Sequence, residues 1–505
     1  MSFRACPWLP CVLLALLSCA SDPGAGLPRA RSAASTLHYR VRFEPGLRVA
    51  RTRICFEGRP PHQLRPIAGP GPDFIGAVRG PAGRPLPRSG GVVRLGQLTP
   101  GSCVSFRSRV SGRRRGDAVL SSQVSWLLRS PRSSRATLEL ELPPGVHAWL
   151  PWGGEGARAV LPASALELAG HVVLGDFERR SFEVRGTRVE LVVLPGPLSV
   201  DAQACARVVS EAVRTVAQVY GRFPTDALHV VVVPVGPKVD EQDDPIPFGL
   251  MRRGGGATAM LLVRADASEA DLRDNWVAYH ELSHLLLPML DRRDGWLAEG
   301  IPTYYQEVAR VRAGLQDERA AWARIVAGLQ RGAADACAMA RPAALGEMLS
   351  AKHVHRGSLG LDVGGCSRES LSGAAEDMHQ TGHFYRVYWS GMAFALMADV
   401  ELRSGAEPTS LDALLRQARP EIRACRGFTS GSLLMRRLDR IAGRQLLWRS
   451  YARFGTRRDF PDLSRLFERL GVQILADGSV ELEDRAPLSH VRRAIMAPRI
   501  ALSRP

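Results

Sequence analysis

Between residues 37 and 179, hydrophobic and polar residues alternate in short runs. The segments LHYRVRF (37–43), CVSFRSRV (103–110) and ATLELEL (136–142) place an apolar side chain at about every second position. A two-residue period is that of a β-strand with one buried face, and turns rich in glycine and proline separate the runs. We therefore predict an antiparallel β-sandwich domain over residues 37–179.

A different pattern begins near residue 180. The segments RVELVVLPG (188–196), ALHVVVVPV (227–235) and GGGATAMLLVR (254–264) are longer apolar runs, and residues 201–221 carry apolar side chains at helical spacing up to a glycine. This mixture predicts an α+β fold.

We expect a catalytic domain over 180–330, a mainly helical part over 331–470 that completes the site, and a C-terminal tail over 471–505. In that tail the pattern predicts a short strand pair followed by a basic extension. Within the catalytic domain, Ser268 is expected to open the helix that Pro288 closes, and residues 255–263 are expected to form an edge strand.

The composition excludes wholesale disorder and disfavours nucleic acid as a partner. The 505 residues are 45% hydrophobic and carry a formal net charge of +17. The positive charge comes almost entirely from arginine, because Lys238 and Lys352 are the only lysines. The arginines are spread through every region and have no aromatic residues between them. A platform for single-stranded nucleic acid would require such aromatic residues. We therefore expect no nucleic-acid partner.

The N-terminus resembles a bacterial lipoprotein signal. Arg4 gives a positive start, residues 12–17 are apolar, and Ser18 directly precedes Cys19. By that resemblance residues 1–18 are a signal peptide, Cys19 is the lipidation site, and residues 19–36 are a tether. Because an alanine follows the cysteine, the resemblance implies an envelope lipoprotein of the outer membrane. An ordinary secretory signal is the alternative.

Six cysteines remain beyond the signal and the predicted anchor, and an even number in an exported chain is compatible with disulfides. Cys55 and Cys103 lie in neighbouring strand-like segments and are the favoured pair. Cys337 with Cys366 is the second candidate. None has the spacing of a cysteine zinc knuckle.

The segment VAYHELSHL (277–285) places His280 and His284 four residues apart around Glu281. On a helix these histidines lie one above the other, so both imidazoles can bind one zinc ion at about 2.0–2.1 Å. Glu281 is rotated by about 100° from His280, so its carboxylate can take the proton of a zinc-activated water. For this motif alone, the alternative is a pair of core histidines without a metal.

A catalytic zinc site needs a third protein ligand and an open position. In DGWLAEGIPTYY (294–305), Glu299 is a carboxylate within an otherwise apolar helical pattern. An unpaired buried carboxylate is costly, and a metal would neutralise it. The following Pro302 predicts a kink, because proline has no backbone N–H.

Together, HELSH and WLAEGIPTYY resemble the gluzincin metallopeptidases, especially the glycyl aminopeptidase and the alanyl aminopeptidase/leukotriene-hydrolase families. The resemblance covers roughly residues 191–417 and implies one Zn²⁺ per chain, bound by His280, His284 and Glu299, with Glu281 as the base. The segment VYWSG (387–391) is similar to the Tyr-x-x-Gly helix of these families, which implies that Tyr388 stabilises the oxyanion. A core tyrosine is the alternative for that residue.

The segment FGLMRR (248–253) departs from the family pattern. It falls where the aminopeptidases have a Gly-x-Met-Glu-Asn-like stretch, whose glutamate binds the free amino terminus of the substrate. Here Arg252 replaces that glutamate, and an arginine repels an ammonium group and attracts a carboxylate. We expect Gly249, Arg252 and Gly255 to contact the substrate, without strict aminopeptidase specificity.

These features predict an exported, lipid-anchored zinc metallopeptidase that cleaves a peptide or protein substrate aligned on the edge strand. One alternative is a non-catalytic surface lipoprotein on the same fold that binds peptides or wall fragments. A third possibility is hydrolysis of another bond, because related metal sites also open epoxides.

Overall fold

The computed structural model describes residues 35–67, 74–131, 135–153, 158–239, 244–337, 369–425 and 427–498. The predicted signal, the lipidation site Cys19 and almost all of the predicted tether lie outside the described residues, and so does Cys366. Within the described part, no helix has the length and hydropathy needed to span a membrane.

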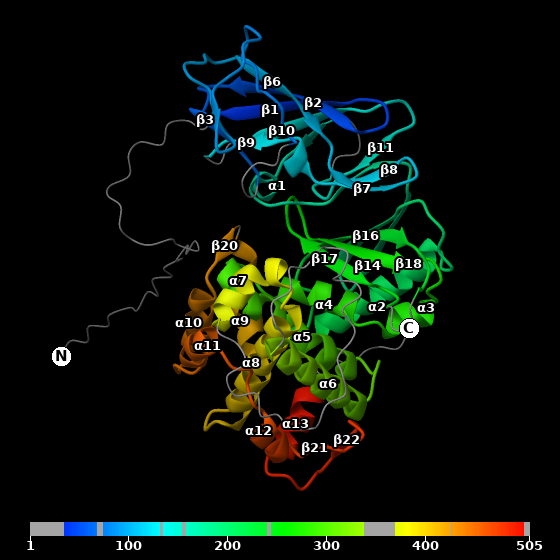
Figure 1. Cartoon of the computed structure of the whole chain (residues 1–505), viewed down its shortest axis with the longest axis vertical. Helices are drawn as coiled ribbons and strands as arrows, with labels where there is room; N and C mark the ends of the chain where they lie inside the picture. The colour runs from blue at the N-terminus through cyan, green and yellow to red at the C-terminus, as the bar shows by residue number, and fades with distance from the viewer. Residues whose placement is uncertain are drawn as a thin grey trace, which may run out of the picture.

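The N-terminal part is built from three small sheets, shown in blue and cyan in Figure 1. The largest has the order β12-β10-β1-β2-β6 and consists of β1 (Thr36–Phe43), β2 (Val49–Glu57), β6 (Cys103–Arg109), β10 (Ala136–Glu141) and β12 (Arg158–Val160). Buried and exposed residues alternate along β1, β2 and β6, as their sequence pattern requires. The β1–β10 pair is parallel. The prediction of a purely antiparallel sheet is therefore wrong for this pair.

The second sheet has the order β11-β13-β8-β7 and the third β4-β5-β3-β9. Their strands are β3 (Gln63–Pro66), β4 (Arg88–Ser89), β5 (Val92–Arg94), β7 (Gly112–Arg115), β8 (Ala118–Ser121), β9 (Leu128–Arg129), β11 (His147–Trp149) and β13 (Val172–Gly175). The short helices of this part are η1 (Gln123–Ser125) and α1 (Ala163–Glu167). A disulfide joins Cys55 to Cys103, which are directly paired on β2 and β6 and are the pair that the sequence favours. Cys337 is also disulfide-bonded.

The sheet that positions the site has the order β14-β15-β16-β18-β17. Its strands are β14 (Glu178–Val184), β15 (Thr187–Val193), β16 (Ala227–Val235), β17 (Phe248–Arg252) and β18 (Thr258–Arg264). One face packs against α2 (Ala202–Tyr220), which Asp201 caps and Gly221 ends in the left-handed conformation. The other face packs against β8, β11 and β13 of the N-terminal part, so a hydrophobic core joins the two parts.

One edge of this sheet is β17. The prediction that residues 255–263 form the edge strand is therefore wrong. The segment predicted as the edge corresponds to β18, which lies between β16 and β17. The reason is that the FGLMR segment folds back antiparallel onto β18 and covers its outer side. A peptide that adds a strand to this sheet would therefore pair with β17.

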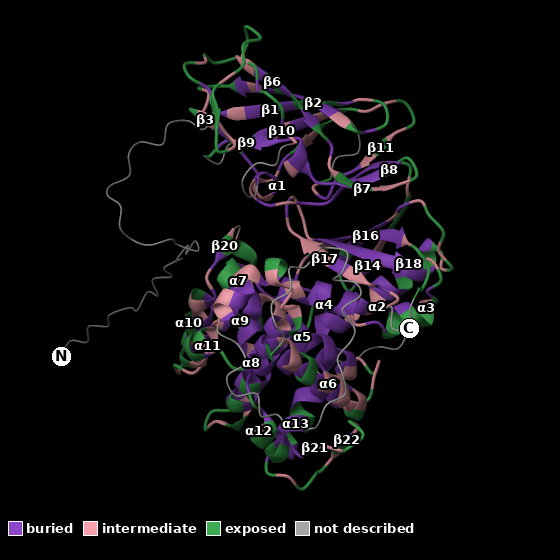
Figure 2. Ribbon diagram, in the orientation of Figure 1, coloured by how far each residue is buried: buried purple, intermediate pink, exposed green. Residues whose placement is uncertain are grey.

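The remaining chain is mostly helical and forms the lower part of the molecule in Figure 1. Its helices are α3 (Glu269–Asp274), α4 (Val277–Ser283), η2 (His284–Leu286), η3 (Arg292–Asp294), α5 (Gly295–Arg312), α6 (Glu318–Cys337), α7 (Leu371–Thr381), α8 (Phe384–Ser404), α9 (Leu411–Ala424), α10 (Gly431–Ala442), α11 (Leu447–Thr456), α12 (Ser464–Leu470) and α13 (Ser489–Met496). The strand pairs are β19 (Met289–Leu290) with β20 (Phe428–Thr429), and β21 (Val472–Ile474) with β22 (Val480–Leu482). Figure 2 shows that α4, α5 and α8 are largely buried in its interior.

Two helix predictions need correction. The predicted helix from Ser268 is divided into α3 and α4, although Ser268 and Asp271 do form the expected capping box. Asn275 breaks it, because its backbone is extended and its side-chain oxygen accepts the N–H of Val277. At the C-terminus, the β21–β22 pair is present, but residues 489–496 form helix α13, whose buried face packs into the core.

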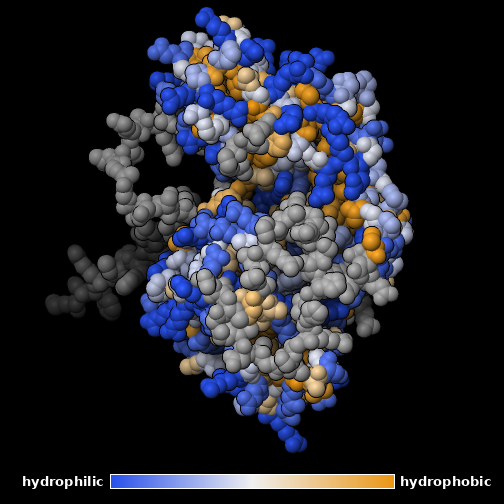
Figure 3. Space-filling model, viewed as in Figure 1, coloured by the Kyte–Doolittle hydropathy of each residue, from blue (hydrophilic) through white to orange (hydrophobic). Residues whose placement is uncertain are grey.

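On the face in Figure 3, hydrophilic residues cover both the N-terminal sheets and the helical part.

Candidate metal centre

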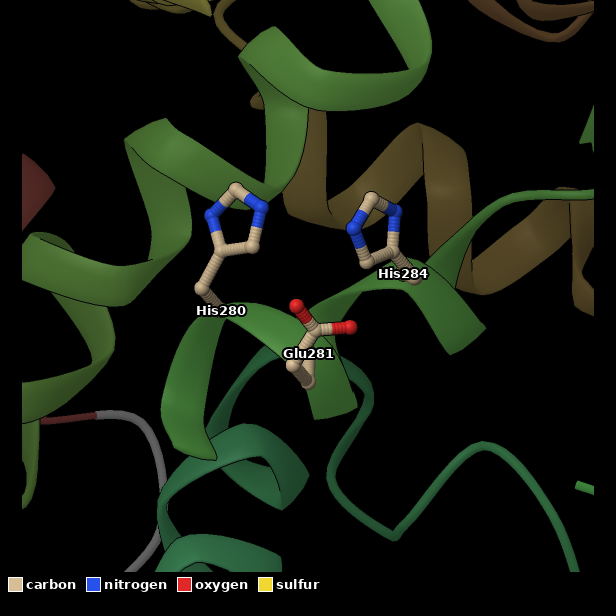
Figure 4. Close-up of side chains that lie close together, drawn as sticks. All are labelled: His280, Glu281 and His284. Carbon is tan, nitrogen blue, oxygen red and sulfur yellow. The ribbon is translucent and has the colours of Figure 1, made fainter. Parts of the chain in front are cut away.

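Two consecutive elements present the HELSH residues. His280 and Glu281 lie on α4, and His284 is the first residue of the 3-10 turn η2 that follows without interruption. The apolar side chains of Val277, Ala278 and Leu282 are buried in the main core and fix this segment. The helical spacing therefore places the two imidazoles on one side, as Figure 4 shows, with ring centroids 4.9 Å apart.

Helices α5 and α8 bring the other two predicted residues to this point. They cross where their backbones almost touch: a Cβ atom on Gly391 would lie 1.8 Å from the carbonyl oxygen of Trp296, and one on Gly300 would lie 2.1 Å from Gly391. Only glycine allows this approach. Because Glu299 precedes Gly300 and Tyr388 is one turn before Gly391, the crossing places both beside α4.

The donor atoms converge in a way that suits zinc. One carboxylate oxygen of Glu299, Oε2, lies 3.2 Å from Nε2 of His280 and 3.5 Å from Nε2 of His284. Ligands about 2.0–2.1 Å from a tetrahedral zinc ion are separated by about 3.3–3.4 Å, so these distances match. Two imidazoles and one carboxylate are also a ligand set that zinc uses. The residues present therefore fit the metal.

Glu281 is the fourth group at this point. Its carboxylate is directed towards the space between the two imidazole rings in Figure 4, and its nearest oxygen lies within 4.8 Å of a ring nitrogen of each histidine. The site thus contains one more carboxylate than a three-ligand metal site needs. Glu299 could act as the third ligand, because its oxygen approaches both Nε2 atoms, and Glu281 lies beside the same point.

A polar chain behind the site orients His280. Its Nδ1 atom lies 2.9 Å from Oε1 of Gln306, and the amide nitrogen of Gln306 donates to Glu307 over 3.1 Å. The second contact fixes the amide, so its oxygen faces the imidazole and Nδ1 is the protonated nitrogen. With a proton held on Nδ1, Nε2 is the nitrogen that could bind a metal.

The edge strand β17 contacts Glu281 directly. The backbone N–H of Met251 donates to its carboxylate, and a Cβ atom on Gly249 would lie 2.4 Å from its Cγ. The pKa of Glu281 is raised to about 7, chiefly by burial; Glu299 contributes to this increase, while His280 and the Met251 N–H act against it. A carboxyl group with such a pKa can both take up and release a proton near neutral pH.

The other site groups are tuned by burial and by one another. Burial would raise the pKa of Glu299, but His284 and His280 lower it below its ordinary value. Burial likewise opposes charging of His280, yet the Glu299 carboxylate raises its pKa. The pKa of His284 falls to about 4, chiefly through burial.

Tyr388 lies against two of the converging side chains, those of His280 and Glu299. Its ring stacks on His280 at 5.7 Å with an interplanar angle of 5°, and its hydroxyl group donates to Glu299. Burial and the carboxylates of Glu299 and Glu281 raise its pKa well above the ordinary value. The phenol therefore stays protonated and available as a donor.

The three predicted substrate-contacting residues lie around β17 but not in one place. Gly249 faces Glu281, whereas Arg252 donates to the carbonyl of Gly170 over 3.3 Å and so faces the N-terminal part. Gly255 is in the β17–β18 turn at φ +90°, where a Cβ atom would lie 2.2 Å from the Trp152 ring. Their contact with a substrate stays a prediction.

Sequence reasoning missed two polar groups of this site. Gln306 follows Glu299 by seven residues, which is two helical turns, so the period alone could have placed it on the same face of α5. Arg253 was overlooked in favour of its neighbour Arg252. No local pattern reveals it, because its contacts are with a helix end that is distant in the sequence.

Comparison with known proteins identifies the fold. The chain is similar to an aminopeptidase N family protein from Idiomarina loihiensis, with 14% identity, a TM-score of 0.62 and coverage of 86% of this chain and 78% of that one. It also matches the M1 zinc metallopeptidase from Deinococcus radiodurans, with 17% identity, a TM-score of 0.48 and coverage of 85% and 94%. A variant of that protein bound to a Tyr-Ser-Ala substrate matches with 16% identity, a TM-score of 0.49 and coverage of 85% and 95%.

No family model and no curated protein matches the sequence. The first of these likenesses shows the fold, an N-terminal β-sheet region followed by a helical region, as in the aminopeptidase N family. The predicted α+β class and the predicted structural resemblance to this group of zinc metallopeptidases are thereby confirmed.

Proposed function

We propose that the chain is a zinc metallopeptidase that hydrolyses peptide bonds. The observation that carries this proposal is the convergence of His280, His284 and Glu299 on one point, with Glu281 and Tyr388 on its border. These five residues come from α4, η2, α5 and α8. The shared fold supports the proposal independently of these distances.

His280, His284 and Glu299 would hold one zinc ion, which when bound polarises the substrate carbonyl and acidifies water. In its ionised form, Glu281 accepts a proton from the attacking water. It then gives this proton to the leaving amine. Its pKa of about 7 suits both steps. Tyr388 donates a hydrogen bond to the negative charge that develops on the carbonyl oxygen.

Catalysis fits these residues better than a non-catalytic scaffold does. A scaffold stabilised by zinc needs only His280, His284 and Glu299. A buried carboxylate such as Glu281 costs free energy, and its ionised form costs more. This free-energy cost is understandable if Glu281 is a base that exchanges protons with a reactant, whereas a scaffold has no use for such a group.

The edge strand β17 is the proposed docking place of the peptide, because it borders Glu281 and has no neighbouring strand on its outer side. We do not propose strict aminopeptidase specificity. Arg252 would repel a free amino terminus, and its own pKa is lowered by burial with no carboxylate to compensate it.

We also propose that the chain is exported and anchored to the outer membrane through a lipid on Cys19. The residues Arg4, Ser18 and Cys19 and the apolar segment between them support this. The mass of the mature N-terminal peptide, before and after removal of ester-linked fatty acids, tests the anchor. A mature chain that begins at another residue would contradict it.

The activity is tested by digesting a mixed peptide library with the purified mature protein, with and without a zinc chelator. We expect cleavage, zinc in the purified protein, and loss of cleavage on chelation that added zinc restores. Zinc without cleavage would contradict the proposal and favour the peptide- or wall-binding scaffold. Release of single residues from free amino termini would show that Arg252 does not exclude an ammonium group.

A further inference from the structure

The segment that carries His284 ends abruptly. After the 3-10 turn η2, Leu287 is extended, and the next residue is Pro288, which has no N–H. The last carbonyl groups of a helix have few partners within it and take donors from elsewhere. Here the carbonyl of His284 accepts the N–H of Leu287 over 3.1 Å, and Leu286 and Leu287 are buried.

Two side chains from elsewhere in the chain donate to the carbonyl groups of His284, Leu286 and Leu287. The guanidinium group of Arg253 donates from Nη2 to the carbonyl of His284 over 2.6 Å and from Nη1 to the carbonyl of Leu287 over 2.8 Å. The hydroxyl group of Tyr220, at the end of α2, donates to the carbonyl of Leu286. Arg253 therefore holds the backbone of the second histidine itself.

The position of Arg253 is electrostatically unfavourable for its charged form. Burial lowers its pKa to about 10, and within the described part of the chain no carboxylate is paired with it. An arginine whose guanidinium is buried against carbonyl groups alone is unusual, because buried charges are normally paired. Its neighbour Arg252 lies on the other side, against Gly170, and has no contact with the ligand segment.

We propose that Arg253 is a positioning residue for His284, because its two hydrogen bonds fix the backbone of this proposed metal ligand. This inference rests on the proposed function only in so far as the site binds zinc. It adds a direct link from the end of edge strand β17 to a metal ligand.

The test measures the zinc dissociation constant of the full-length protein by competition with a chelator. In Arg253→Met we expect it to rise about tenfold or more, as is common when the group that orients a ligand is lost. Arg253→Lys keeps the charge but cannot span both carbonyl groups, so an intermediate rise is expected. The lysine variant also keeps the test valid if the methionine variant does not fold.

The absorption spectrum of the Co²⁺-loaded Arg253→Met variant separates positioning from stability. It should change if Arg253 positions His284, because it reports the geometry of the ligands, whereas a merely structural role predicts an unchanged spectrum.

A matched control is available in the same chain. Arg252→Met removes the same charge one residue away and should leave zinc affinity within twofold of wild type. Wild-type affinity in folded Arg253→Met would overturn this inference and leave the proposed function intact, whereas a wild-type protein that binds no zinc would overturn the proposed function.

Discussion

At the scale of single residues, the site separates groups that hold a metal from groups that handle protons. Glu299 has a lowered pKa and stays ionised between the two histidines, as a ligand must. Glu281 has a pKa raised to about 7 by burial, as a base that also releases its proton must. Two carboxylates a few ångströms apart thus take different roles because their surroundings differ.

Tyr388→Phe tests the proton-donating role at this scale. The phenylalanine ring can keep the stacking on His280, whereas the hydroxyl group that would donate to the oxyanion is lost. We expect kcat to fall about 10²–10³-fold with little change in KM or in zinc content. Steady-state kinetics on a cleaved library peptide measure this, and an unchanged kcat would restrict Tyr388 to packing.

At the scale of elements, the crossing of α5 and α8 positions Glu299 and Tyr388 relative to each other. Neither Gly300 nor Gly391 has room for a Cβ atom, because each lies against the backbone of the opposite helix. Helices with larger residues at the contact lie 8–10 Å apart, so the glycines allow a closer approach. The glycines in both motifs therefore serve the geometry of the site.

Gly391→Ala is expected to separate the two helices. Its Cβ atom would meet the carbonyl oxygen of Trp296, and relief of this overlap should cost about 1–3 kcal/mol of stability. Zinc affinity and kcat should fall together, since Glu299 and Tyr388 both move. Denaturation and zinc titration measure this, with Gly236→Ala as the control, because a Cβ atom there meets nothing within 4 Å. Equal behaviour of the two variants would contradict the role of the crossing.

Most elements could be predicted from local pattern, and most contacts between them could not. The period of a helix sufficed to place His280, Glu281 and His284 on one side, and the long apolar run of residues 227–235 agrees with the burial of β16 on both faces. Strand order was not predictable, because nothing local in residues 254–264 shows that β17 folds back over them. The break at Asn275 was missed because a side-chain hydrogen bond competes there with a continuous helical pattern.

At the scale of the whole molecule, the N-terminal sheets and the five-stranded sheet share a buried interface that contains polar groups. The Trp149 indole donates to Glu190 over 3.0 Å, and His229 packs edge-on against the same tryptophan at 5.3 Å. Nearby, His171 contacts the carbonyl of Leu250 on β17. Histidines buried in such an interface make its stability depend on pH.

Acid should weaken this interface. Burial lowers the pKa of His229 to about 4 and that of His171 to about 3, so both are neutral in the folded protein. The unfolded chain binds these protons near pH 6.5, so stability is fully present above 6.5 and falls as the pH drops towards 4. For His229 alone the loss is about 3 kcal/mol.

Urea denaturation between pH 7 and 4, followed by tryptophan fluorescence, measures this loss. His229→Gln, which cannot be charged, should show a shallower dependence of stability on pH than wild type. Identical slopes in the two proteins would show that His229 does not contribute to the acid sensitivity.

The central claim is that the converging residues form a working hydrolytic zinc site, and Glu281→Gln tests it most directly. The substitution keeps the size of the side chain but removes its capacity to accept a proton, and it leaves His280, His284 and Glu299 unchanged. The measurement is zinc per chain together with the rate of cleavage of one library peptide. We predict about one zinc per chain, as in wild type, and loss of activity by several orders of magnitude; undiminished cleavage in the zinc-loaded variant would contradict the account.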